Sequence, residues 1–204
     1  LVATYGLDQV RYFLLREVPF GNDGDFSHQA MVNRMNGELA NDLGNLAQRV
    51  LSMVAKNCDG AVPQHGTFNA DDDKMLGSAM DLISGVRVVI DRQAFNEVLE
   101  DVWGVIRMAN GYVDAQAPWK LKKEDPDRMA TVLYVLVESI RHIALLLQPF
   151  MPDTMARMLD QLAVSPEHRS FDYLGPDHKL TPGTLLPAPQ GVFPRYVEAE
   201  GEEG

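Results

Sequence analysis

Cysteine is nearly missing from this sequence, which has a single one, Cys58, among 204 residues. One thiol cannot form an internal disulfide or a cysteine-based zinc site, so a disulfide-stabilised scaffold is excluded. A secretory signal peptide is missing too, because the first residues lack a basic start and a small-residue cleavage site. These absences favour a reducing compartment, and we expect a cytoplasmic protein.

Basic charge and long hydrophobic runs are also scarce. No apolar run approaches the length of a membrane-spanning helix, so the sequence predicts no membrane partner. Eighteen Lys and Arg residues stand against 29 Asp and Glu residues, which gives a net charge of −11 at pH 7. This balance argues against a protein that coats nucleic acid through its phosphates. A local RNA site stays open if basic residues gather on one face.

Motifs for catalysis and metal binding are not found. The sequence has no glycine-rich phosphate loop and no nucleophile elbow, and its five histidines show no metal-ligand spacing. Asp23 and Asp25 stand two apart beside glycines, as at the start of a calcium loop, but the later ligands and the terminal glutamate are missing. We therefore predict no catalytic residue, no cofactor site and no metal ion in this chain.

Helical periodicity is what the sequence has in abundance. Apolar residues recur at steps of three and four through four long segments, near 32–54, 70–90, 95–113 and 126–147, and through a shorter one at 153–162. Prolines, glycines and asparagines separate these segments. The pattern predicts an all-α fold, an antiparallel helical bundle with short loops.

The composition divides the chain into three parts. Residues 1–27 are helical and then turn-rich, residues 28–164 hold the bundle, and residues 165–204 are proline-rich without a helical period. We expect the last part to be an extended arm that packs on a neighbouring surface and ends in a solvated acidic tail. Because the sequence opens at Leu1 in mid-pattern, we interpret it as part of a longer polypeptide.

One face of the first long helix carries polar residues that suit nucleic-acid bases. Asn41, Asn45 and Arg49 are spaced by four, so they lie on one side of a helix. Asn and Arg have forked hydrogen-bonding groups, and Asn is a poor helix former. A solvated flank of the bundle explains the same three residues more simply.

The end of the third helix is marked by the stretch "DAQAPWKLKK". Pro118 limits this helix, since a residue before proline is pushed out of the helical region. Trp119 is therefore expected in or just after the final turn. Lysines follow it directly, at Lys120, Lys122 and Lys123.

Four stretches together resemble the methionyl-tRNA synthetase family. "YGLDQVRYFLLREVPFGNDGDFS" resembles the segment after the KMSKS loop, and "ELANDLGNLAQRV" resembles the first helix of the anticodon-binding domain. "ANGYVDAQAPWKLKK" and "GVFPR" are similar to later stretches of the same family, in the same order. Leucyl, isoleucyl and valyl enzymes share the first two in weaker form, so the third stretch decides for the methionyl family.

The resemblance implies that the bundle recognises the CAU anticodon of methionine tRNA. Trp119 would stack on an anticodon base, while Asn45 and Arg49 would hydrogen-bond base edges, as is usual where proteins read unpaired RNA loops. Nearby loop phosphates would be neutralised by Lys120, Lys122 and Lys123. The family joins methionine to its tRNA through a methionyl adenylate, with ATP and Mg²⁺. Its HIGH and KMSKS signatures are missing here, so this chain alone is expected to be inactive.

The resemblance also implies partners for each part of the chain. Residues 1–27 would end the region that links the catalytic domain of the same polypeptide to the bundle and contacts the inner side of the tRNA. The arm would run back toward that domain. Some members carry a further dimerisation domain that this sequence lacks, so we expect a monomer.

Two alternative functions stay open. The chain could be the anticodon domain of a leucyl, isoleucyl or valyl enzyme, or a helical module that docks on another protein. The Pro118-Trp119 pair disfavours the first, and the order of the four stretches along the whole chain disfavours the second.

Overall fold

The structure is a computed structural model that describes residues 1–19, 21, 24 and 26–198. Within these residues the secondary structure is helical, and the β-structure is limited to an isolated antiparallel bridge between Ala61 and Leu185. The predicted all-α class is confirmed. Asp23 and Asp25, which were considered as calcium ligands, lie outside the described residues.

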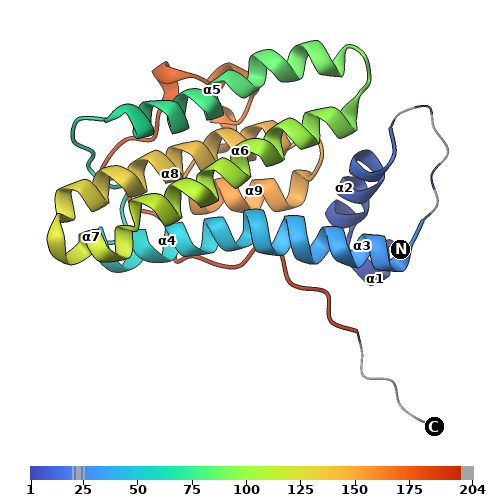
Figure 1. Ribbon diagram of the computed structural model, residues 1–204, viewed down its shortest axis with the longest axis horizontal. Coiled ribbons are helices and arrows are strands. Elements are labelled where there is room, and N and C mark those ends of the chain that lie inside the picture. The colour runs from blue at the N-terminus through green and yellow to red at the C-terminus, as the bar shows by residue number, and fades with distance from the viewer. Residues whose placement is uncertain (20, 22–23, 25, 199–204) are drawn as a thin grey trace, which may run out of the picture.

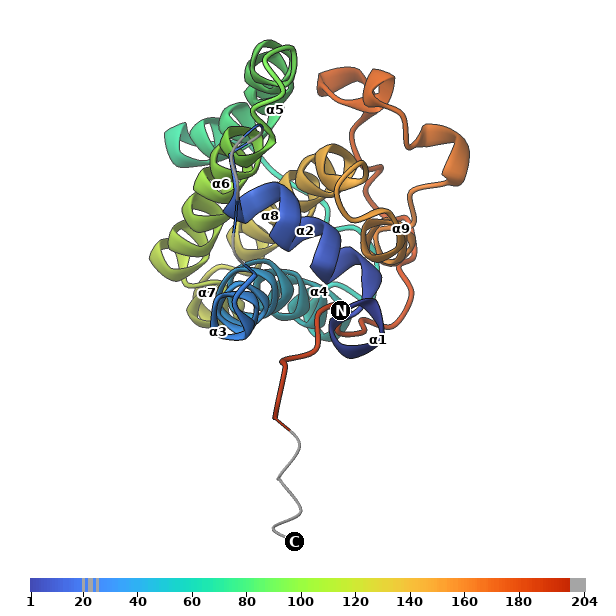
Figure 2. The same ribbon diagram turned by 90° about the vertical axis from the view of Figure 1, so that its right-hand side faces the viewer.

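Two short helices open the chain, α1 (Val2–Tyr5) and α2 (Leu7–Glu17). Gly6 separates them with a left-handed φ of 93°, where a Cβ atom would lie 2.4 Å from the side-chain oxygen of Gln9. α2 crosses the end of the bundle (Figure 2). There Tyr12 packs its ring 4.7 Å from that of Trp103, which ties these helices to the main core.

The first helix of the bundle is continuous but not uniform. It consists of α3 (His28–Asn33), a π-helical stretch η1 (Arg34–Gly44) and α4 (Asn45–Asn57). The apolar spacing predicted α-helix throughout, and the π-helical middle was not foreseen because Leu39 and Leu43 still face the core. The side chain of Asn110 on the third long helix donates to the Asp42 carbonyl at 3.1 Å, so part of the wider turn is satisfied from outside.

Four further helices complete the predicted bundle. They are α5 (Ala70–Ile90), α6 (Phe95–Gln116), α8 (Pro126–Leu147) and α9 (Pro152–Gln161). Their starts follow local signals: a capping box of Asn69 and Asp72 begins α5, and prolines occupy the first positions of α8 and α9. The five predicted helical segments are therefore confirmed within a few residues.

Helix α8 is the centre of the bundle, surrounded by α4, α5, α6 and α9 (Figure 2). It is long and apolar enough to cross a membrane when judged by length and composition alone. This corrects our expectation that no apolar run reaches such a length. The other elements bury 94% of its most apolar window, as is usual for a core helix.

One helix was not predicted. α7 (Pro118–Glu124) follows α6 after a single residue, Ala117, which adopts left-handed angles of φ 44° and ψ 58°. Pro118 does follow the end of α6, but it also begins a new helix as its first residue. Trp119 is therefore the second residue of α7 rather than part of the last turn of α6.

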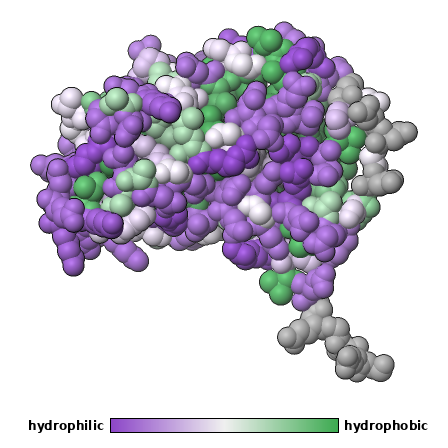
Figure 3. All heavy atoms as spheres, viewed as in Figure 1, coloured by the Kyte–Doolittle hydropathy of each residue, from purple (hydrophilic) through white to green (hydrophobic). Residues whose placement is uncertain are grey.

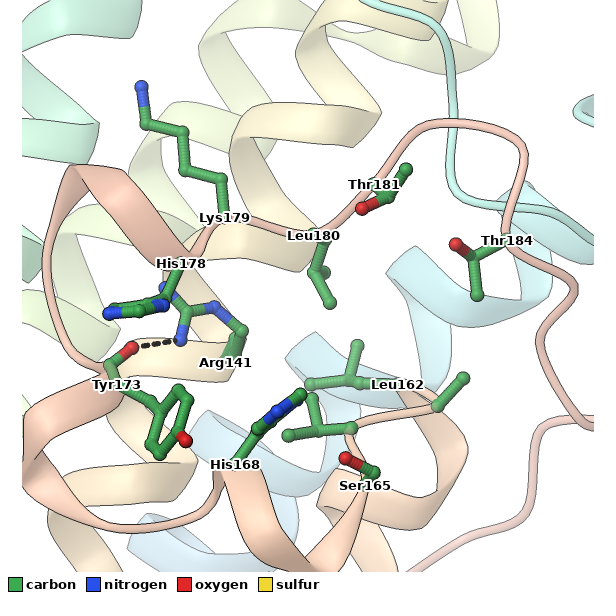
Figure 4. Close-up of a pocket in the computed structure, with 12 residues that line it drawn as sticks. Arg141, Leu162, Ser165, His168, Tyr173, His178, Lys179, Leu180, Thr181 and Thr184 are labelled. Atoms are coloured by element: carbon green, nitrogen blue, oxygen red, sulfur yellow. Dashed lines mark hydrogen bonds between the residues drawn. The ribbon is translucent and has the colours of Figure 1, made fainter.

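The proline-rich arm packs on its own bundle, and it is not simply extended. It contains three 3₁₀ turns, η2 (Pro166–His168), η3 (Phe171–Tyr173) and η4 (Pro176–His178). The buried guanidinium of Arg141 on α8 donates to the Tyr173 carbonyl at 2.7 Å (Figure 4). Further along, the backbone N–H of Val62 donates to the Thr184 carbonyl at 2.8 Å.

Candidate nucleic-acid interface

Helix α7 lies at the end of the bundle opposite the N-terminus (Figure 1), and there Trp119 and Arg49 of the predicted site are in contact. Three helices meet there: α4 contributes Arg49, the last turns of α6 contribute Asp114, and α7 contributes Trp119. In the space-filling view this end is covered largely by hydrophilic side chains (Figure 3).

Trp119 is held away from the core by the corner between α6 and α7. The left-handed turn at Ala117 redirects the chain, and Pro118 is buried as the first residue of α7. The following indole is 45% exposed, in contrast to Trp103, which is completely buried. A large aromatic ring is thus presented to solvent from a short helix with a fixed start.

Arg49 lies between Trp119 and Asp114. Its guanidinium carbon is 5.6 Å from the centroid of the Trp119 ring, within cation–π range. Its Nη2 atom is 3.0 Å from Oδ1 of Asp114, and the two side chains are 35% and 65% exposed. An ion pair this exposed contributes about 0–1 kcal/mol, so Arg49 can exchange Asp114 for another acceptor at small cost. The structure brings Arg49 and Trp119 together.

Asn45 is exposed at the start of α4, one turn before Arg49. It lines a hollow of about 290 Å³ between α4 and the arm, together with Phe193 and Arg195. Asn41, one turn earlier, accepts a hydrogen bond from Arg195 and so holds the arm. On the polar face predicted from the spacing, Asn41 therefore binds the arm, whereas Arg49 contacts Trp119.

Exposed lysines surround Trp119 on α7. Lys120, Lys122 and Lys123 make up half of the six lysines in the chain, and none forms an ion pair with any residue that the structure describes. Leu121, between them, packs against the core. In a chain of net charge −11, these three lysines concentrate basic charge on a helix of seven residues.

The histidines do not form a metal site in the described part of the chain, where no group of three or more His, Cys, Asp or Glu residues is arranged to hold an ion. His142 is buried, and its Nε2 atom accepts from the Gly175 N–H, so it is neutral. Burial, followed by the charge of Arg141, lowers its pKa. His168 and His178 flank Tyr173 in a hollow of about 530 Å³ under the arm (Figure 4).

Two contacts of the site residues were beyond sequence reasoning. Asp114 lies within a quoted stretch, but nothing in that stretch indicates that it pairs with Arg49. Arg195 is 154 residues away from Asn41. Only folding of the arm onto the bundle brings Arg195 to Asn41.

Comparison with known proteins connects this geometry to a family. The family described as "Anticodon binding domain of methionyl tRNA ligase" matches residues 62–203, and the family described as "tRNA synthetases class I (M)" matches residues 1–51. This chain belongs to the methionyl-tRNA synthetase family. The resemblance stated from the sequence is confirmed, and the leucyl, isoleucyl and valyl enzymes and the docking module are set aside.

Individual relatives agree with the family assignment. A methionine–tRNA ligase of Mesorhizobium japonicum is 52% identical over 98% of this chain, and one of Mycobacterium tuberculosis is 50% identical over 100% of this chain. The crystal structure of the apo Mycobacterium tuberculosis methionyl-tRNA synthetase superposes with a TM-score of 0.94 at 50% identity over 97% of this chain. That enzyme in complex with methionyl-adenylate gives a TM-score of 0.92 over 95%.

The chain covers only part of these synthetases. It spans 39% of the Mesorhizobium enzyme and 40% of the apo Mycobacterium structure. The residues present here therefore account for the helical end of a methionyl-tRNA synthetase.

Proposed function

We propose that this chain recognises the CAU anticodon of methionine tRNA within a longer methionyl-tRNA synthetase. The observation that carries the proposal is the contact between Arg49 and the exposed ring of Trp119, next to three exposed lysines of α7 and one turn from the exposed Asn45. In this proposal residues 28–164 are the anticodon-binding domain, residues 1–27 end the connecting region, and residues 165–204 are the arm.

The chemistry of these side chains suits an unpaired RNA loop. Stacking of a base on the Trp119 ring contributes about 1–3 kcal/mol to binding, whichever base it is. Arg49 and Asn45 add the sequence dependence, because their forked groups pair with particular base edges. The α7 lysines are placed to hold the adjoining phosphates.

The whole enzyme joins methionine to its tRNA through a methionyl adenylate in this proposal. ATP and Mg²⁺ would be bound by the catalytic domain of the same polypeptide, as the resemblance to the family implies. The chain contributes recognition to that reaction. We further propose a cytoplasmic enzyme that is monomeric, which light scattering after gel filtration checks.

The decisive experiment compares two RNA stem-loops that differ only in the anticodon. The chain should bind the CAU stem-loop of methionine tRNA at least tenfold more tightly than one with a changed anticodon, measured by fluorescence anisotropy at fixed salt. Equal affinity for both would remove the proposed function while leaving the family assignment intact.

A further inference from the structure

The segment that carries Trp119 is closed by a hydrogen bond between its two ends. Gln116 is the last residue of α6, and Arg128 lies in the first turn of α8. The Nη2 atom of Arg128 donates to Oε1 of Gln116 at 2.7 Å. All of α7 lies in the loop that this bond closes.

The same arginine is fixed to a buried carboxylate on a third helix. Asp72, in the first turn of α5, is completely buried and accepts from Nη1 and Nη2 of Arg128 at 2.5 and 2.7 Å. It also accepts from the Tyr112 hydroxyl at 2.5 Å and from the backbone N–H of Asn69 at 2.9 Å. We refer to Asp72, Tyr112, Gln116 and Arg128 as the Asp72 cluster.

Both carboxylate oxygens of Asp72 accept hydrogen bonds. Oδ1 accepts from Tyr112 and Arg128, and Oδ2 accepts from Asn69 and Arg128. A buried polar network with every member satisfied is rigid and fixes one arrangement of the elements that it joins. Here it joins the start of α5, the end of α6 and the start of α8.

Besides the buried Pro118 and the packing of Leu121 on the core, helix α7 depends on the ends of its loop for its direction. Its seven residues are too few to be stable as an isolated helix, and its first turn has no side-chain cap. Its tertiary contacts are mainly with α8, the helix that Arg128 starts. The direction of α7, and with it the position of Trp119 beside Arg49, therefore depends on how the two ends of the loop are held.

We propose that the Asp72 cluster positions Trp119 for base stacking by clamping both ends of the loop that carries it. Its members would not touch RNA. Their contribution to binding rests on the proposed anticodon function, because a preorganised ring loses less conformational freedom when the base arrives.

The test uses variants that disturb the clamp without unpairing Asp72. Gln116→Ala removes the closing bond, together with the exposed bond from Gln116 Nε2 to Asp71 Oδ2 at 3.2 Å, but keeps the ion pair between Arg128 and Asp72. Gln116→Glu also loses the bond to Asp71 but keeps an acceptor for Arg128, so it isolates the effect of the closing bond. Arg92→Ala is the matched control, because it removes an exposed ion pair with Glu97 in the α5–α6 connection. All proteins are labelled with 5-fluorotryptophan, which gives one signal for Trp119 and one for Trp103.

Gln116→Ala should shift or broaden the Trp119 fluorine signal, leave the Trp103 signal in place and weaken CAU stem-loop binding three- to tenfold. Gln116→Glu should restore both properties, and Arg92→Ala should change neither. The proposal is overturned if Gln116→Ala leaves Trp119 and binding unchanged, or if Trp103 and the melting temperature shift along with Trp119. The fluorine signals need no RNA, so failure of the wild-type chain to bind would contradict only the proposed function.

Discussion

At the residue scale, the proposed base-reading surface depends on a few side chains with different physical tasks. Trp119 offers area, Arg49 and Asn45 offer hydrogen bonds with direction, and Asp114 holds Arg49 in the absence of RNA. Each task predicts a different consequence of substitution.

Loss of the indole should affect binding and spare chemistry. Trp119→Ala removes a stacking surface worth about 1–3 kcal/mol, so binding of the CAU stem-loop should weaken at least tenfold. In the intact enzyme, methionyl-adenylate formation should stay nearly unchanged, because α7 lies at the end of the bundle away from the connecting region. ATP–pyrophosphate exchange measures the second property, and an equal loss of both would contradict this division of labour.

Loss of the forked groups should affect discrimination between anticodons. Asn45→Ala and Arg49→Ala should each reduce the preference for CAU over single-base variants by about 1–3 kcal/mol. Competition among stem-loops for each variant gives the measurement. A uniform loss across all anticodons would assign Arg49 to phosphate positioning instead.

Periodicity revealed at this scale that Asn45 and Arg49 share a helix face, and the exposure of Trp119 follows from the proline before it. Their convergence did not follow from periodicity, since Arg49 and Trp119 lie on different helices and are 70 residues apart in sequence. Resemblance to the family supplied the functional roles, which stay predictions until the variants are measured.

At the scale of the element, the corner at Ala117 decides where α7 points. A non-glycine residue with left-handed angles is strained by about 1–2 kcal/mol, and glycine is not. Glycine in turn costs about 0.4–1 kcal/mol through the entropy of the unfolded chain. Ala117→Gly should therefore raise the free energy of unfolding by about 0–1.6 kcal/mol, whereas β-branched Ala117→Val should lower it. Urea denaturation of the three proteins checks this order, and a valine variant as stable as the wild type would contradict it.

Long helices were predictable because each shows its apolar stripe over several turns, with caps and prolines at its ends. The α7 helix was not predictable, because seven residues make too few turns to show an apolar stripe. Its proline is also equally compatible with the end of the preceding helix. The π-helical stretch was missed for a different reason: its buried leucines keep a spacing that an α-helix also satisfies.

At the scale of the whole molecule, the acidic excess limits how many RNA phosphates the proposed surface would hold. With three α7 lysines as the phosphate contacts, the logarithm of affinity should fall with the logarithm of salt concentration with a slope of about −2. The triple variant Lys120→Gln, Lys122→Gln and Lys123→Gln should flatten this slope and keep the preference for CAU. Lys179→Gln, on the arm, is the control and should leave the slope unchanged.

Attachment of the arm predicts a pH dependence of stability. His142 faces Glu138, Arg141 and Lys179, and its lowered pKa means that the unfolded chain takes up a proton before the folded one does. Stability is then fully present above the unfolded pKa of about 6.5 and is lost as pH falls through the lower folded value. The free energy of unfolding should decrease from pH 7 to pH 5 in the wild type and change less in His142→Gln, measured by urea denaturation. Parallel pH profiles would exclude His142 as the cause.

Composition predicted that the arm would pack on a surface, but not which one. Its anchors are single residues, such as the Tyr173 carbonyl on Arg141 and the Arg195 side chain on Asn41, and isolated contacts leave no period in a sequence. Resemblance placed the arm near a catalytic domain, and this stays a prediction.

The uninterrupted helix from His28 to Asn57 also fixes the distance between the α2 end of the bundle and Arg49. Near its start Arg34 is paired with Glu17 of α2 at 2.8 Å, and toward its far end it carries Asn45 and Arg49. Thirty residues at about 1.5 Å each make it at most about 45 Å long, with no loop that could lengthen or fold. In the proposed complex, an RNA that touched both ends at once would have to match this span, so the helix would select its partner by size as well as by sequence.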